Sequence, residues 1–145
     1  MADAVPGRNA AAFAAFAFAA RSLGTSRVRV LLVEDDDLVR EVTAEMLEEA
    51  GYEVLVAASA AEAERISAHT PVIDILVTDI IMPGGNGVDL ARRLSRRRHG
   101  LKTLFTTGYT RHIAPELDDA PILDKPYHRD ALIHALGRLI GLETA

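Results

Sequence analysis

The chain has 145 residues, of which 49% are hydrophobic, and a formal net charge of −5, so it can bury one core but is short for two ordinary domains. It contains no cysteine, which excludes disulfides, thiolate metal sites and a cysteine nucleophile and fits a cytoplasmic protein. The acidic balance argues against nucleic acid as a partner of the whole surface, because such binding requires positive potential.

The first 26 residues are an Ala/Phe-rich extension that precedes the domain we expect over residues 27–145. Its uninterrupted apolar part, residues 10–20, is shorter than the roughly 20 residues of a membrane span. No membrane span is therefore predicted. A signal peptide is disfavoured because Asp3 spoils the basic start of the segment. We interpret residues 1–26 as a helical or disordered extension, since alanine is the best helix former.

Short apolar runs alternate with amphipathic stretches from residue 28 onward. We expect five strands, over residues 28–33, 52–57, 73–79, 102–107 and 121–125. Four helical stretches lie between or after them: residues 37–50, ending before Gly51; a stretch opened by the capping box of Ser59 and Glu62; residues 87–97; and a last helix around Leu132 to Ile140. In the first helix, the expected apolar positions are Val39, Val42, Met46 and Ala50.

This alternation predicts an α/β protein with a parallel sheet covered on both faces by right-handed crossovers. The expected fold is flavodoxin-like: a doubly wound, five-stranded sheet in the order 2-1-3-4-5. Only twelve residues separate Gly108 from Pro121, so helix 4 is expected to be short or irregular. In this order strands 1 and 3 are neighbours, and ligands bind where their carboxyl ends diverge.

Acidic residues stand at those two strand ends: Glu34 and Asp35 after strand 1, and Asp79 at the end of strand 3. Crowded carboxylates raise one another's pKa, so the cluster requires a cation. Oxygen ligands suit a hard divalent ion such as Mg²⁺, and the lack of Cys and His ligands argues against zinc.

A hydroxyl pair and an ammonium are expected at the same edge, because Thr106 and Thr107 end strand 4 and Lys125 ends strand 5. A carboxylate nucleophile, a hydroxyl, an ammonium and a divalent cation are the components of in-line phosphoryl transfer. In this hypothesis Asp79 attacks phosphorus and the other groups hold the oxygens.

The segments "VLLVEDD", "VTDIIMPGGNG", "LFTTGY" and "LDKPY", in this order, resemble a response-regulator receiver domain of two-component signalling, over residues 28 to about 142. Receivers of hybrid histidine kinases with a shortened helix 4 region are similar. The resemblance implies that Asp79 is the phosphoacceptor and that Glu34 and Asp35 form the metal corner. It also implies that Thr107 is the switch hydroxyl and that Lys125 binds phosphate.

Two backbone features are implied in the same way: the main-chain carbonyl of Ile81 as a metal ligand, and a cis bond between Lys125 and Pro126. The sequence departs from the family where a switch aromatic is often found, because that position holds Ile122. Tyr109 and Tyr127 are the candidates to replace it. The apolar side chain of Ile81 is expected to slow self-dephosphorylation, since it cannot orient the attacking water.

The function that we predict is a stand-alone, non-enzymatic receiver that takes a phosphoryl group from a histidine kinase or a histidine phosphotransfer protein with Mg²⁺. It would signal through a phosphorylation-dependent contact with a downstream protein, or act as a phosphate sink. Two alternatives remain: a constitutive adaptor, and an aspartate-nucleophile phosphatase, which usually needs an acid at the place of Ile81. The basic segment 92–102 is interpreted as solvated helix surface or a docking patch for an acidic partner.

Overall fold

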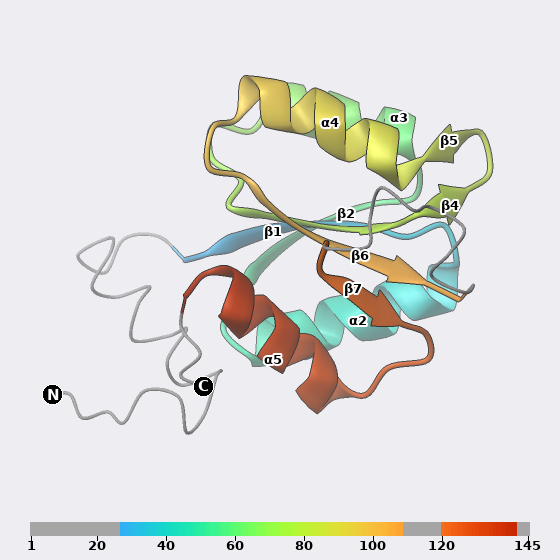
Figure 1. Cartoon of the computed structure of the whole chain (residues 1–145), viewed down its shortest axis with the longest axis vertical. Coiled ribbons are helices and arrows are strands. Elements are labelled where there is room, and N and C mark those ends of the chain that lie inside the picture. The colour runs from blue at the N-terminus through green and yellow to red at the C-terminus, as the bar shows by residue number, and fades with distance from the viewer. Residues whose placement is uncertain (1–26, 109–119, 142–145) are drawn as a thin grey trace, which may run out of the picture.

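The computed structural model describes residues 27–108 and 120–141 (Figure 1). The extension over residues 1–26, the switch candidate Tyr109 and nearly all of the region expected for helix 4 lie outside these residues. Within the described residues, no helix is both long enough and apolar enough to cross a membrane.

A five-stranded parallel sheet forms the centre of the domain, in the order β2-β1-β3-β6-β7 (Figure 1). This confirms the predicted doubly wound order. The strand bounds are β1 Arg29–Val33, β2 Glu53–Ala57, β3 Ile75–Asp79, β6 Lys102–Thr107 and β7 Ile122–Asp124. A two-stranded antiparallel ladder, β4 Ile81–Met82 with β5 Gly85–Asn86, follows β3 and was not predicted from the sequence.

Two pairs of helices cover the two faces of the sheet (Figure 1). Helices α2 (Asp37–Glu49) and α5 (Arg129–Leu139) lie on one face, and α3 (Ala60–Ala68) and α4 (Gly87–Arg97) lie on the other. Alternate residues of each strand enter separate cores, as the pleat of a strand requires. In β1, for example, Val30 and Leu32 belong to the core under α2 and α5, whereas Leu31 and Val33 belong to the core under α3 and α4.

The buried face of α2 differs from the expected one. The helix buries Thr43, Leu47 and the C-cap residue Ala50, whereas Val42 is 40% exposed. Apolar residues surround more than half of this helix, so spacing alone does not select the side that meets the sheet. Of the apolar positions noted from the sequence, Ala50 is buried and Met46 packs against the core, whereas Val42 faces solvent, as does Leu38.

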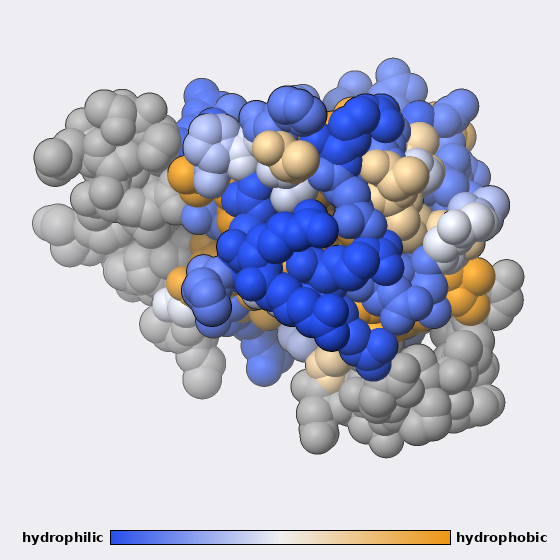
Figure 2. All heavy atoms as spheres, turned by 90° about the horizontal axis from the view of Figure 1, so that it is seen from above, coloured by the Kyte–Doolittle hydropathy of each residue, from blue (hydrophilic) through white to orange (hydrophobic). Residues whose placement is uncertain are grey.

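The basic end of α4 is bound into the fold. Arg93 and Arg97 form ion pairs with Glu64 of α3. The guanidinium of Arg98 donates to main-chain carbonyls at the end of α3, including that of Ser67. The face that carries α3 and α4 is strongly hydrophilic (Figure 2). These contacts favour a structural role for the arginines over a free docking patch.

Candidate functional site

Four strands direct polar side chains to one place at the carboxyl edge of the sheet. Glu34 directly follows β1, Lys125 directly follows β7, and Asp79 is the last residue of β3. Thr106 lies in β6, opposite Asp79 in register. The residues two positions earlier in each strand all belong to the core under α2 and α5: Leu32, Val77, Leu104 and Leu123. Because strand side chains alternate, the four polar groups share that side of the sheet.

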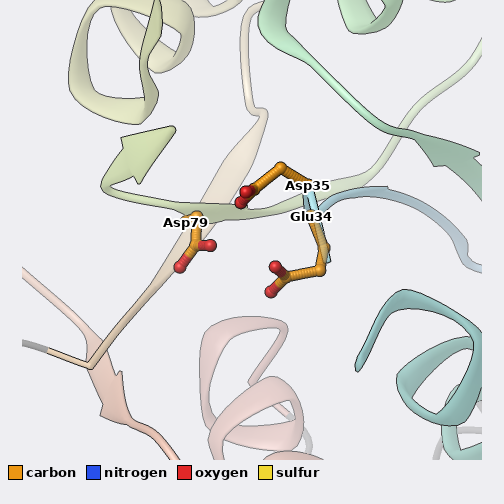
Figure 3. A group of neighbouring side chains, drawn as sticks. All are labelled: Glu34, Asp35 and Asp79. Carbon is orange, nitrogen blue, oxygen red and sulfur yellow. The ribbon is translucent and has the colours of Figure 1, made fainter. Parts of the chain in front are cut away.

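Three carboxylates converge at this edge, those of Glu34, Asp35 and Asp79 (Figure 3). One oxygen of each lies within 4.8 Å of the others. Glu34 and Asp79 are buried, and Asp35 is exposed, so the cluster opens to solvent on one side. An all-oxygen donor set with an excess of negative charge and access to water fits Mg²⁺, which keeps several waters and binds through one or two carboxylates.

Among the described residues, Lys125 brings a positive charge to these carboxylates. Its Nζ lies 2.7 Å from Glu34 Oε1 and 2.9 Å from Asp79 Oδ2. Burial disfavours the ammonium, but the hydrogen bonds to Glu34 and Asp79 outweigh it and raise the pKa of Lys125 above its ordinary value. Lys125 is therefore charged at neutral pH and points its ammonium at the carboxylate predicted to attack phosphorus.

The pKa of the Asp79 carboxyl group lies well above its ordinary value. Burial raises its pKa from 3.8 to about 6, the nearby charge of Glu34 adds to the rise, and the hydrogen bonds from Lys125 and Thr106 oppose it. A divalent cation bound beside it would favour the ionised form. At pH 7 the group is mainly ionised, which is the state required of a nucleophile.

The hydroxyl that touches Asp79 belongs to Thr106. Its Oγ1 donates to Asp79 Oδ1 at 3.1 Å, and the side chain is buried. Thr107, the predicted switch residue, is also buried, but as the next residue of β6 it alternates to the other side of the sheet. From the sequence, both threonines were expected at this edge, and the resemblance singled out Thr107 as the switch hydroxyl. The contact of Thr106 with Asp79 was not predicted, because the register of β3 against β6 is encoded in neither strand alone.

The segment after Asp79 returns sharply to bring α4 against the site. The main-chain N–H of Gly87 donates to Ile80 O at 2.8 Å. A Cβ at Gly87 would lie 1.9 Å from the carbonyl oxygen of Asp79, so only glycine fits there. Ile81 lies in β4 with its side chain 43% exposed. Gly87 ends the segment "VTDIIMPGGNG" but received no role from the sequence, because the requirement for glycine comes from its close approach to the main chain of Asp79.

Ile122 and Tyr127, the described candidates for the switch side chain beside Thr107, pack against different cores. Ile122 is half-buried and packs against the core under α3 and α4. The peptide bond between Lys125 and Pro126 is cis, as the resemblance implied. Tyr127 follows it, and its hydroxyl lies 2.9 Å from Thr43 Oγ1 of α2. Burial raises the pKa of Tyr127, so its hydroxyl is protonated at neutral pH.

Comparison with known proteins agrees with this geometry. The family model of the response regulator receiver domain matches residues 30–137. The chain therefore belongs to the response-regulator receiver domains, the regulatory phosphoacceptor domains of two-component signalling.

Two curated relatives show the range of proteins that carry a similar domain. The response regulator receiver protein CpdR of Brucella abortus (strain 2308) is 35% identical over 116 residues, which are 77% of this chain and 96% of CpdR. The sensor kinase CckA of the same strain is 41% identical over 81 residues, which are 55% of this chain and 9% of CckA.

Solved receiver structures have the same fold. The receiver domain of the hybrid histidine kinase CckA matches with a TM-score of 0.67 and 34% identity, covering 77% of this chain and 98% of that domain. The response regulator TrrA from Thermotoga maritima, solved in complex with Mg²⁺ and BeF, matches with a TM-score of 0.69 and 29% identity, covering 77% of this chain and 98% of TrrA.

Proposed function

We propose that this domain accepts a phosphoryl group on Asp79 from a histidine kinase or a histidine phosphotransfer protein, with Mg²⁺ held by Glu34, Asp35 and Asp79. The observation that carries the proposal is the convergence of these three carboxylates, within 4.8 Å of one another, beside the ammonium of Lys125. Mg²⁺ would neutralise the charge that develops on the phosphoryl oxygens. The main-chain carbonyl of Ile81 is proposed as a further ligand.

On the basis of their contacts, we propose different roles for the two oxygens of Asp79. Oδ2 faces Lys125 and attacks phosphorus while the bond from phosphorus to the donor nitrogen breaks and its electron pair leaves with the imidazole. Lys125 then balances charge on the transferred group, as an ammonium does in other phosphoryl-transfer sites. Thr107 remains the proposed switch hydroxyl, with Tyr109, Ile122 and Tyr127 as candidates to couple it to the surface.

An apolar groove beside the site supports docking of the phosphodonor there. Its volume is about 470 Å³. It is lined by Leu38, Val39, Val42, Thr43 and Met46 of α2 and by Lys125, Pro126 and Tyr127 of the loop after β7. Leu38 is 67% exposed. An exposed apolar patch of this kind is typical of a surface that contacts another protein. A helix carrying the donor histidine would bury this surface and bring its phosphoryl group to Asp79.

Incubation with acetyl phosphate and Mg²⁺ tests the chemistry without a protein donor. We expect intact mass spectrometry to show one added phosphoryl group on the wild type and none on Asp79→Asn. Asp89→Asn, which changes an exposed carboxylate of α4, serves as the matched control and should be phosphorylated normally. Failure of the wild type to gain the mass would leave a phosphorylation-independent adaptor as the better account.

The docking proposal has its own test in the pair of variants Leu38→Ala and Val42→Ala. Each should slow transfer from a phosphorylated cognate kinase severalfold while leaving the rate with acetyl phosphate unchanged. The small donor does not use the groove, so equal slowing with both donors would place the defect in the site itself.

The consequence of phosphorylation is proposed to be a contact with a downstream protein, or drainage of phosphate from a relay in which the domain works as a stand-alone receiver in the cytoplasm. The added group contributes about −1.5 to −2 charges, which suffices to bias a two-state surface near β6 and β7. Partner capture that depends on phosphorylation would support the first outcome.

A further inference from the structure

The hydrogen bond from Thr106 to Asp79 is a feature of the site that the reaction described above leaves without a role. Thr106 Oγ1 donates to Asp79 Oδ1 at 3.1 Å, whereas Lys125 occupies the other oxygen, Oδ2, at 2.9 Å. The two oxygens of the acceptor are thus distinguished by their partners before any phosphoryl group arrives.

Burial holds this contact in place. Thr106 is 2% exposed and Asp79 is 5% exposed. The two residues are also directly paired in the β3·β6 ladder, so the backbone fixes the separation of the side chains. A hydroxyl in this position has little access to water as an alternative partner, and leaving it unpaired would be unfavourable.

We infer that Thr106 sets the lifetime of the phosphorylated domain by stabilising the Asp79 carboxylate as the leaving group of hydrolysis. This inference rests on the proposed phosphorylation of Asp79. In the mixed anhydride, Oδ2 is bonded to phosphorus and Oδ1 is a neutral carbonyl oxygen. When water attacks phosphorus, the bond between phosphorus and Oδ2 breaks, its electron pair returns to Asp79, and the water loses a proton to solvent as phosphate departs.

The returning charge is shared by both oxygens of the carboxylate, so negative charge grows on Oδ1 as the bond to Oδ2 breaks. The hydrogen bond from Thr106 therefore strengthens along the hydrolysis coordinate, because hydrogen bonds to ionised acceptors are roughly twice as strong as neutral ones. An interaction that is stronger in the transition state than in the ground state accelerates the step. Loss of the hydroxyl should prolong the phosphorylated state on the order of fivefold.

The position of the donor separates this effect from that of Ile81. Ile81 lies in β4 after the acceptor and is expected to affect how water is oriented, whereas Thr106 acts on the oxygen that receives the electrons. The two residues therefore influence opposite ends of the breaking bond, and their effects on the lifetime should multiply.

The test follows decay of the aspartyl phosphate after acetyl phosphate is removed, by intact mass, in wild type, Thr106→Val, Thr106→Ala and Thr106→Ser. The valine and alanine variants should decay about fivefold more slowly, and the serine variant, which keeps a hydroxyl, should return to the wild-type rate. Thr103→Val, on the same strand but paired with Leu76 away from the site, is the matched control and should decay normally.

A second arm repeats the decay in EDTA. Because Thr106 acts through its own hydrogen bond and not through the ion, the wild type should still decay faster than Thr106→Val when Mg²⁺ is removed. Three results would each overturn the inference: equal decay of wild type and Thr106→Val in EDTA, an unchanged lifetime in folded Thr106→Val and Thr106→Ala, or a serine variant that fails to restore the rate. Absence of phosphorylation in the wild type would instead overturn the proposed function, and this inference with it.

Discussion

Replacement of Asp79 by asparagine should stabilise the apo domain while abolishing phosphorylation. The pKa of Asp79 is raised from 3.8 to about 6 in the folded protein. Between these two pH values the folded state therefore binds a proton that the unfolded chain has already released. Stability therefore falls as pH rises through this window and stays reduced above it. The shift of about two units corresponds to at most about 3 kcal/mol, and to roughly 1.5 kcal/mol after allowance for solvent screening and for the lost pairing with Lys125.

Urea unfolding in EDTA measures this effect directly. At pH 8 we expect Asp79→Asn to be more stable than the wild type by about 1.5 kcal/mol, and at pH 5 by about half of that, because the wild type is then largely protonated. The control Asp89→Asn, at an exposed position, should change stability by less than about 0.5 kcal/mol at either pH. A variant no more stable than the wild type at pH 8 would show that burial of the ionised Asp79 carboxylate does not destabilise the folded domain.

Addition of Mg²⁺ should narrow the difference in the free energy of unfolding between Asp79→Asn and the wild type. A ligand that binds only the folded state stabilises it by about 1.4 kcal/mol at a tenfold excess over its Kd. The wild type offers three carboxylates, whereas the asparagine variant offers two and an amide. We therefore expect Mg²⁺ to raise the free energy of unfolding of the wild type more than that of the variant. Equal stabilisation of both would place the ion elsewhere.

Three further predictions concern residues around the site. Ile81→Asn should shorten the lifetime of the aspartyl phosphate severalfold by providing a polar group for the attacking water, and an unchanged decay rate would refute this role. Gly87→Ala should destabilise the domain and impair phosphorylation by acetyl phosphate, because its Cβ would overlap the carbonyl oxygen of Asp79; normal activity with unchanged unfolding would contradict that packing. Tyr127→Phe should lower the free energy of unfolding by about 1 kcal/mol through loss of its hydrogen bond to Thr43, and Thr43→Val should add little more in the double variant if the two hydroxyls act as a pair.

The strands and the acidic edge were predictable because their signals are local. Each apolar run ends at a polar residue, and the right-handed crossover rule then leaves few possible strand orders. The positions of Glu34, Asp79 and Lys125 at one edge follow from that order alone. The bounds of α4 were similarly accessible, since the predicted helix over residues 87–97 agrees with Gly87–Arg97 in the structure.

Features that depend on tertiary approach were not predictable in the same way. The choice between Thr106 and Thr107 depends on how β6 is registered against β3, and a shift of one residue exchanges the two sides of a strand. The exposure of Val42 depends on which side of α2 meets the sheet. The need for glycine at position 87 arises from the main chain of Asp79. In each case the deciding contact is set by how the chain packs in the folded domain and not by the immediate neighbours of the residue.

Because the site is distributed over four strands, only a completely folded domain can be phosphorylated efficiently. Glu34 comes from the first described strand and Lys125 follows β7, the last of the sheet. A chain still emerging from the ribosome, or one with β7 detached, would keep its carboxylates but lack the ammonium that faces Asp79. Such a chain could not compete effectively with finished molecules for a phosphodonor, so signalling capacity would track the number of intact domains and not the amount of polypeptide made.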